Sequence, residues 1–478
     1  VGFTDDSDTG GAVVLAFDKS RSHARKQWLE NHLEHPREPV EYGDVSDISI
    51  YDFIHRDLVN FSMADVTRSI PHMVDGLKPS QRKVMFGCLK RKLTSEIKVA
   101  QLSGYISEVS AYHHGEASLQ GAIIGMAHNY MGSNNINLLE PCGQFGTRLM
   151  GGKDAASSRY IFTRLTKDAT KIFDSRDNNV LTYMDDDGKP VEPEFYVPVI
   201  PMVLVNGAEG IGTGYSTTIP CYNPEDIKAN LMRCMKGEAP VAMKPWYRGF
   251  KGTVEDGGDG TWILTGCYKK LSLTNLEIFE LPPGKWTQDY KEFLDGLVDK
   301  GKIHSYSNHS TEEHPCFKII GYMGKNAVKD LGLSKRVHTT NMWLRTPNGL
   351  KKYSSPEEIL VDFFAVRLGY YKKRKARLLK EYKFDSEVVS NKAHFVQKVV
   401  DGVIRVFRRK RVDIEVDLVD HGLKKVSGSY DYLMNFKTDQ YTSEKIESLL
   451  NEKSAKERLY SELSDTSVIT LWENDLKL

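Results

Sequence analysis

Apolar side chains recur at helical spacing early in the chain. Ser49–Asp52 has the composition of a capping box, and Ile54, Leu58 and Phe61 then fall on one helix face. Ser69–Pro71 should end the element, because proline disfavours helix in the residue before it. The pattern therefore predicts an amphipathic helix over about 49–69.

Three more helices are predicted after it. Lys78-Pro79 opens the next one, since helices accept proline in their first turn. A further helix begins near Ser95, and another runs from about Glu116 to Tyr130. Short helices with tight turns, followed by an extended glycine-rich loop, are typical of a winged-helix arrangement within the helix-turn-helix class.

The pattern changes to strands and turns between residues 221 and 350. A glycine- and aspartate-rich turn separates the predicted strands Gly252–Glu255 and Thr261–Thr265, which should form a hairpin. A further strand ends near Leu281 and leads to a helix over about Tyr290–Val298. These elements predict a separate α/β module.

The last part of the chain is predicted to be a long helical arm. Ser355-Pro356 opens a helix with a cap and a proline at its first position, and no proline follows to the end of the chain. A helix this long cannot bury itself in one small domain, so a coiled coil is expected. A returning helix is indicated by Ile446, Leu449, Leu450, Leu459 and Leu463. The residues between, Val412–Tyr441, should form a small tip and a dimer contact.

Composition restricts the class of protein. The chain has 478 residues, 40% hydrophobic and 27% charged, which is ordinary for a soluble protein of two to four domains. No run of 18 apolar residues occurs, so no membrane span is expected. The first residues lack a methionine and a signal segment, which suggests a cut end. The six cysteines form no CxxC pair, which argues against a zinc ribbon or a disulfide framework and favours a reducing compartment.

Net charge also matters, because it is only +1. Any binding to nucleic acid must then rest on local basic patches. The segment of predicted short helices has such a bias, with Arg68, Lys78, Arg82, Lys83 and Lys98. A solvated charged face is the alternative interpretation of these residues.

The segment 141–160 carries the candidate chemistry. It combines a tyrosine, Tyr160, with glycines that permit close approach of backbone and with cations suited to anionic oxygen. Its glycines and cations are Gly143, Gly146, Gly151, Gly152, Arg148, Lys153 and Arg159. A tyrosine beside a guanidinium can act as a nucleophile toward phosphorus. The alternative is a surface turn with an ordinary buried tyrosine.

Two other features are candidates for function, and two acidic segments are assigned none. His113-His114 lacks a third ligand at suitable spacing, so a hydrogen bond or a proton transfer near a phosphate is a better use than zinc. Ile211 lies among glycines and is either a turn residue covered by another domain or a wedge between DNA bases. The Asp185–Gly188 run is interpreted as a turn, and the acidic residues before position 9 as a disordered end.

Together these motifs resemble the eukaryotic type IIA DNA topoisomerases. The resemblance extends from about Ala16 to Leu478. It rests on Arg68–Pro71, Asp75–Val84, Ala111–Glu116, Gly146–Arg148, Gly151–Ala156, Arg159-Tyr160 and Val205–Gly214.

The resemblance implies roles for individual residues. Tyr160 would attack a DNA strand and become joined to its 5′ phosphate, with Arg159 holding the phosphate and His114 as a catalytic partner. Ile211 would be the intercalating wedge. DNA binding is expected at Arg68, Lys78, Arg82, Lys83, Arg148 and Lys153.

The resemblance also implies a mixed α/β multidomain architecture. Residues 1–45 would be the end of a toprim region with a linker. A winged-helix cleavage domain over 46–199 and an α/β tower over 200–355 would follow. A long antiparallel coiled coil would comprise 356–411 and the returning helix 442–478, with a small helical exit gate over 412–441. The segment Gly422–Tyr430 is shorter than the family's usual insertion at the gate.

Partners and cofactors follow from the same resemblance. Double-stranded DNA, a homodimer formed through the exit gate and the winged-helix domains, and a nuclear location are expected. Mg²⁺ would be held by toprim residues outside this chain, with no metal ligand within it, and ATP would serve the complete enzyme. The isolated chain is therefore expected to cleave poorly. A DNA-bending or clamp protein without chemistry is the alternative, and a tyrosine recombinase fits less well.

Overall fold

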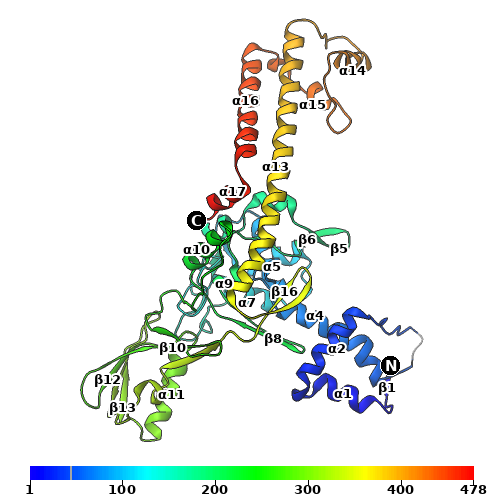
Figure 1. The fold of residues 1–478 in the computed structure, drawn as a ribbon. Helices are drawn as coiled ribbons and strands as arrows, with labels where there is room; N and C mark the ends of the chain where they lie inside the picture. Colours follow the sequence, from blue (N-terminus) through cyan, green and yellow to red (C-terminus); the bar gives the residue numbers. More distant parts are fainter. Residues whose placement is uncertain (44–45, 478) are drawn as a thin grey trace. The chain divides into compact units, whose positions relative to one another are not determined.

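The computed structural model describes residues 1–43 and 46–477 (Figure 1). Its contacts divide the chain into two compact units. The first comprises Val1–Arg367 together with the last residues from Asp475, and the second comprises Leu368–Asn474. The boundary falls inside the long helix that was predicted to begin at Pro356.

The first unit begins with helices rather than an irregular end. Helices α1 (Thr9–Phe17) and α2 (Ser22–Glu34) follow strand β1 (Gly2–Thr4), which pairs in parallel with β2 (Asp47–Ser49). The Thr9 hydroxyl donates to the Asp6 carboxylate at 3.0 Å, and the Asp6 backbone N–H donates back to the Thr9 oxygen. The prediction of a disordered acidic end is wrong, because this turn leads into α1.

The predicted short helices are present. Helix α3 (Ile50–Asp52) continues through a π-helical turn at Phe53–Leu58 into α4 (Val59–Ser69), and the Ser49 hydroxyl caps it as expected. Helices α5 (Pro79–Lys90), α6 (Val99–Ser110) and α7 (Glu116–Ala127) follow.

The third predicted helix starts four residues later than expected. Ile97–Lys98 forms the short strand β3, which pairs with β4 (Phe162–Thr163). Strand pairing with a distant segment prevents these two residues from extending the helix. The pairing also places the start of α6 beside the segment that contains Tyr160.

A buried ion pair joins the loop before α5 to its first turn. The Arg82 guanidinium donates from Nε to Asp75 Oδ2 at 2.7 Å and from Nη2 to Asp75 Oδ1 at 3.1 Å. The same carboxylate accepts from the backbone N–H groups of Leu77 and Tyr196, each at 3.0 Å. Both charged side chains are almost fully buried, and both carboxylate oxygens are satisfied.

The rest of the first unit contains antiparallel sheets, together with helices such as α8 (Lys167–Ile172) and α10 (Pro224–Met235). The predicted hairpin is observed as β9 (Thr253–Asp256) and β10 (Thr261–Thr265), with β15 (Ser334–His338) on the other side of β10. A four-stranded sheet has the order β11-β12-β14-β13, and α11 (Thr287–Asp299) contributes to its core. We call this sheet and α11 the four-stranded module. Its strands are Cys267–Lys270, Leu276–Glu280, Phe317–Ile320 and Ser305–Asn308, in sheet order. Of the turn predicted at Asp185–Gly188, only Asp187 and Gly188 form the turn that joins β5 (Tyr183–Asp186) to β6 (Lys189–Pro193).

The second unit contains most of the long helix α13 (Pro356–Val400) and the returning helix α16 (Ser443–Asp465). Lys375 donates to the Ser464 carbonyl at 2.9 Å, and Lys456 contacts Asp385 at 2.9 Å. Residues later in α13 contact residues earlier in α16, so the two helices are antiparallel, as predicted. The chain after α13 also contains helices α14 (Arg411–Asp420), α15 (Asp431–Met434) and α17 (Val468–Asp475).

The Asp75–Arg82 pair gives a stability prediction. Asp75→Leu should destabilise the first unit by about 3–5 kcal/mol, because it leaves a buried guanidinium without its counter-charge. Adding Arg82→Met should recover only part of that loss, because the Leu77 and Tyr196 N–H groups still lack the Asp75 acceptor. Thermal unfolding followed by circular dichroism measures both effects. The exposed Arg411–Asp431 pair is the control, and Asp431→Asn should leave the transition unchanged. Equal effects of Asp75→Leu and Asp431→Asn would contradict the assignment.

Candidate active site

Tyr160 lies on the surface, and its backbone is held on both sides. Its side chain is 70% exposed, so the alternative of a buried tyrosine is excluded. Its N–H donates to the Ser157 carbonyl at 2.9 Å, and the next residue, Ile161, accepts from the Val99 N–H at 3.0 Å. Phe162 exchanges two backbone hydrogen bonds with Cys142, at 2.9 and 3.0 Å. An accessible phenol is therefore attached to a fixed segment of backbone.

Two cations close to Tyr160 in sequence are exposed. The Arg159 guanidinium lies 5.7 Å from the centre of the Tyr160 ring and is within 3.4 Å of the Ser157 hydroxyl. Within residues 1–43 and 46–477, neither Arg159 nor Lys153 forms an ion pair with a carboxylate. Their charges remain available to an anionic ligand such as a phosphate.

The glycines of this segment allow protein groups, rather than a ligand, to approach the backbone. Gly146 has φ +102°, and a Cβ there would lie 2.5 Å from the Gly152 Cα. A Cβ on Gly151 would lie 2.3 Å from the Trp286 indole. Asp154 closes the loop by accepting from the Thr147 N–H at 2.9 Å and from its hydroxyl at 2.5 Å. The expectation that these glycines admit a ligand is corrected, since the loop packs on itself and on Trp286.

Three of the predicted DNA-binding cations are engaged in ion pairs inside the protein. Arg82 is paired with Asp75, and Arg148 with Glu280, all four side chains being almost fully buried. Lys83 Nζ lies 2.9 Å from a buried Glu192 carboxylate and also donates to the Ser110 carbonyl. The prediction of direct DNA contact is corrected for Arg82 and Arg148, because burial leaves no surface for a phosphate. The Lys83 charge is likewise taken up by Glu192.

Arg68 lies beside the hairpin that carries Ile211. The Asp65 carboxylate is 3.4 Å from the Arg68 guanidinium and accepts from both the N–H and the hydroxyl of Thr213, at 2.9 and 3.0 Å. The Arg68 side chain remains 43% exposed. Asp65 thus joins α4 to the turn of this hairpin while Arg68 still reaches solvent.

Ile211 projects from strand β7 (Ala208–Gly212), which pairs with β8 (Tyr215–Ile219). It is 85% exposed. The glycines on either side face α4, where a Cβ on Gly210 would lie 2.1 Å from the Ser69 carbonyl oxygen and one on Gly212 would lie 3.1 Å from the Val66 Cα. Alternation along the strand then turns the isoleucine outward. The alternative that another part of the described chain covers Ile211 is excluded.

The two adjacent histidines have different surroundings. His113 Nε2 lies 3.1 Å from an Asp186 oxygen at the end of β5. His114 is exposed, and its ring is edge-on to Tyr112 with centres 5.4 Å apart. No hydrogen bond or ring contact joins His114 to Tyr160 among the residues that the structure describes. A role for His114 in proton transfer therefore stays a prediction.

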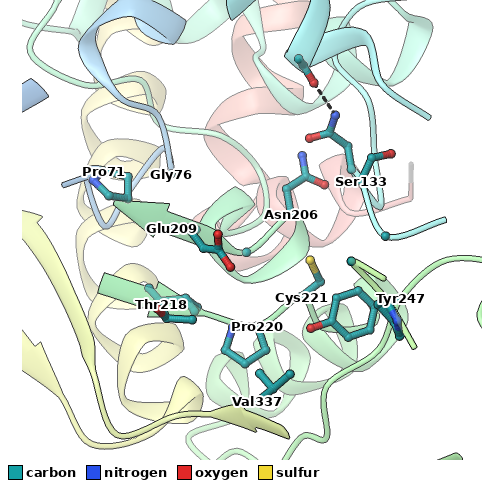
Figure 2. Close-up of a pocket in the computed structure, with 18 of the residues that line it drawn as sticks. Pro71, Gly76, Ser133, Asn206, Glu209, Thr218, Pro220, Cys221, Tyr247 and Val337 are labelled. Carbon is teal, nitrogen blue, oxygen red and sulfur yellow. Dashed lines mark hydrogen bonds between the residues drawn. The ribbon is translucent and has the colours of Figure 1, made fainter. Parts of the chain in front are cut away.

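A cavity of about 920 Å³ lies in the first unit beside the β7–β8 hairpin. Lys78 and Glu209 both line it, and Figure 2 shows Glu209 and Thr218 on the two hairpin strands with Cys221 and Tyr247 nearby. Burial lowers the pKa of Lys78, and the Glu209 charge partly offsets that effect. The sequence did not predict the other basic and aromatic side chains that line this cavity, which are His128, Tyr130, Trp286, Lys335, Arg336 and His338. They come from separate segments without a shared motif, so only their meeting in space identifies them.

Comparison with known proteins gives the family of this chain. Residues 68–477 match the DNA gyrase/topoisomerase IV A-subunit family, and residues 2–66 match the C-terminal associated domain of TOPRIM. The chain belongs to the DNA gyrase/topoisomerase IV family. The two matches meet within α4, whereas the boundary expected from the sequence lay at residue 45.

Relatives in this topoisomerase family cover nearly the whole chain. DNA topoisomerase 2 of Arabidopsis thaliana is 41% identical over 531 residues, which cover 99% of this chain and 36% of the plant protein. DNA topoisomerase 2 of Plasmodium falciparum (isolate K1 / Thailand) is 41% identical over 521 residues, covering 99% of this chain and 37% of its own length. The chain therefore spans about a third of the length of the curated relatives it matches.

A solved structure agrees with this placement in the topoisomerase family. The Plasmodium falciparum topoisomerase II DNA-binding, cleavage and re-ligation domain superposes with a TM-score of 0.89 and is 41% identical. The match covers 99% of this chain and 70% of that one. The mixed α/β fold expected from the resemblance is thus confirmed.

The surroundings of Tyr160 do not fit a magnesium ion. Mg²⁺ prefers carboxylate oxygens, whereas the residue next to Tyr160 is the cation Arg159. The Asp154 carboxylate, six residues before Tyr160, already accepts from the N–H and the hydroxyl of Thr147. In the described parts of the chain, no group of three or more His, Cys, Asp or Glu side chains is arranged to hold a metal.

In the same residues, no helix has the length and apolar character needed to cross a membrane.

The packing of the hairpin on α4 gives a second prediction. Gly210→Ala should destabilise the first unit by about 1–3 kcal/mol, because its Cβ meets the Ser69 backbone and forces the hairpin away from α4. Gly104→Ala is the matched control, since a Cβ there meets open space within α6 and should be neutral or stabilising. Thermal unfolding of both variants tests this difference. A Gly210→Ala transition at or above that of Gly104→Ala would show that the close contact is absent.

Proposed function

We propose that this chain is the DNA breakage–reunion part of a type II DNA topoisomerase. It would cut both strands of a duplex through Tyr160, allow a second duplex to pass and reseal the break. The observation that supports this function best is the exposed Tyr160 phenol on fixed backbone, beside Arg159, which pairs with no carboxylate among the described residues. Similarity to proteins named DNA topoisomerase 2 supports it as well.

The proposed reaction exchanges one phosphodiester for another. The Tyr160 oxygen attacks the phosphorus of a DNA strand, a bond from phosphorus to the phenolic oxygen forms, and the bond to the sugar 3′ oxygen breaks. The strand then carries a 5′-phosphotyrosyl link and a free 3′ hydroxyl. Because the number of phosphodiester bonds is unchanged, resealing is the same step in reverse and needs no outside energy.

Each step requires charge and proton handling. A free tyrosine has a pKa of about 10, so its phenol must lose a proton to a base such as His114 or water as it attacks. The 3′ oxygen gains a proton as it leaves. Arg159 would hold the negative oxygens of the transition state, with Lys78 and Lys153 as further cations. When bound by residues outside this chain, Mg²⁺ would add positive charge at the phosphate.

The hairpin with Ile211 is proposed to bend the duplex. An exposed apolar side chain on a packed hairpin can enter between two base steps and kink DNA. Arg68 lies close to this hairpin, because the Asp65 carboxylate contacts both Arg68 and Thr213 in the hairpin turn. The Arg68 side chain is 43% exposed beside Asp65, and its guanidinium would contact the nearby backbone phosphate.

The second unit supports a dimer contact at the proposed exit gate. Val412, Val416 and Val419 are spaced to share one face of α14 and are 72%, 53% and 59% exposed. Phe407, just before the helix, is 66% exposed. An apolar stripe of this kind on a helix is typical of a surface covered by a second copy.

Cofactor and location are proposed from the relatives. We infer that the complete protein uses Mg²⁺ and ATP and acts in the nucleus on double-stranded DNA. One relative, from Dictyostelium discoideum, carries the name DNA topoisomerase 2, mitochondrial, so an organelle is the alternative location.

The nucleophile assignment is tested with Tyr160→Phe. The variant should form no covalent DNA adduct, because it lacks the phenolic oxygen. Its affinity for duplex should stay within about tenfold of wild type, since at most one hydrogen bond is lost. Adducts are detected on a labelled duplex with Mg²⁺, with and without a separately prepared toprim segment.

Tyr460→Phe is the matched control, since Tyr460 is also exposed but lies on α16. It should form adducts like the wild type. Adducts in Tyr160→Phe would overturn the assignment. No adduct from the wild type in either condition would favour the alternative of a DNA-bending clamp.

The wedge assignment is tested with Ile211→Ala. The variant should bend a duplex less than the wild type, which should produce a kink of roughly 20–90°. Affinity should change less than bending, since cations provide most of the binding. Fluorescence energy transfer between the duplex ends measures the bend. Leu273→Ala is the control, because Leu273 is fully exposed in the four-stranded module. An unchanged angle in Ile211→Ala would show that the wedge lies elsewhere.

A further inference from the structure

Arg148 is the residue through which the Tyr160 loop contacts the four-stranded module. Its guanidinium pairs with the Glu280 carboxylate, donates to the Leu281 carbonyl at 3.1 Å and lies 3.5 Å from the Glu313 carbonyl. Glu280 ends strand β12, and its side chain also accepts from the Leu281 N–H at 2.9 Å and from the Lys251 N–H at 3.3 Å. The pair therefore ties the loop to the end of a central strand.

The backbone on the C-terminal side of Arg148 follows the first turn of α11. The Gln288 N–H donates to the Leu149 carbonyl at 2.9 Å, and the Thr287 N–H to the Arg148 carbonyl at 3.4 Å. Gly151 then packs on the Trp286 ring, which meets the Tyr130 ring edge-on with centres 5.7 Å apart. Arg148, Leu149 and Gly151 thus each contact the start of α11 or the residue before it.

The same loop continues without a free hinge to Tyr160. Thr147 and Asp154 close its base, and the Gly152 N–H donates to the Thr147 carbonyl at 3.1 Å. The Ala156 N–H donates to the Gln144 carbonyl at 2.9 Å, four residues before Tyr160. A shift of the loop at Arg148 would therefore be transmitted to the phenol.

We propose that Arg148 and Glu280 form a positioning pair for Tyr160. They set where the phenol stands relative to a duplex that lies along the four-stranded module and the β7–β8 hairpin. This inference rests on the proposed function of Tyr160 as nucleophile. It gives the buried arginine of the Gly146–Arg148 motif a role in place of the direct DNA contact expected from the sequence.

The pair is tested with Glu280→Gln and with the double variant Arg148→Met/Glu280→Gln. Glu280→Gln leaves the guanidinium uncompensated and should lower the thermal midpoint. The double variant removes both charges and keeps an acceptor for the Leu281 N–H, so its thermal midpoint should recover toward wild type. If the pair positions the loop, the double variant should form adducts about 10- to 100-fold more slowly than the wild type at saturating duplex, even though its thermal midpoint has recovered. Its Kd for the duplex should be nearly unchanged.

Hydrogen exchange of the loop provides a readout that does not depend on DNA cleavage. Amide protons of residues 144–160 should exchange faster in both variants than in wild type. Asp177→Asn is the matched control, because it breaks another buried arginine pair, with Arg367, away from this loop. It should leave the exchange of 144–160 unchanged even if the protein loses stability.

Two outcomes would overturn the positioning role. One is a double variant whose adduct rate recovers together with its thermal midpoint, which would make the pair merely structural. The other is wild-type exchange of residues 144–160 in both variants. If the wild type itself forms no adduct through Tyr160, the proposed function fails, and loop exchange still decides whether this pair holds the Tyr160 segment.

Discussion

A buried guanidinium or ammonium must have a carboxylate partner, and this constraint organises the surroundings of the candidate active site. Taking such a charge out of water is so unfavourable that an unpaired one would be lost from the interior. Arg82 meets it with Asp75, Arg148 with Glu280 and Lys83 with Glu192. The Arg148 and Lys83 pairs join segments far apart in the chain, and the Asp75 carboxylate also accepts from the distant Tyr196 N–H. Because breaking a buried ion pair costs free energy, each pair keeps its two segments in a fixed relative position.

The cations that remain outside these pairs have a different use. Arg159 and Lys153 stay exposed on the loop that the buried pairs hold in place. A free charge on a fixed backbone is suited to stabilise a negative transition state, because little rearrangement is needed when the phosphate arrives. The division between buried and exposed cations thus separates the residues that build the site from those able to contact DNA.

Close packing at glycines has a comparable effect on apolar side chains. Gly210 and Gly212 let β7 approach α4 so nearly that an added methyl group would meet its backbone. Gly151 does the same for Trp286. In both places the absence of a side chain on one face lets the backbone pack closely. The nearby candidate side chain is then exposed: Ile211 on the hairpin, and Tyr160 at the end of its loop.

Local pattern was enough to predict most of the secondary structure, and it marked Tyr160 as the candidate nucleophile. Caps and early prolines located the helices at Ser49, Lys78 and Ser355, because these signals act within one helical turn. The adjacency of Arg159 and Tyr160 and the order of the motifs indicated the family. Strand β3 was missed, since its two residues are extended only by pairing with β4, about 60 residues later.

The fate of each cation depended on tertiary structure alone. Arg148 and Arg159 look alike in the sequence, and both stand in a glycine-rich loop that suggests anion binding. Glu280 lies 132 positions from Arg148, and Glu192 lies 109 positions from Lys83. No local pattern specifies a partner so distant, because the pairing arises when the sheets and helices pack. The sequence by itself therefore determined which residues carry a positive charge. Only the tertiary structure decided which of those charges are buried in ion pairs and which remain exposed to a ligand.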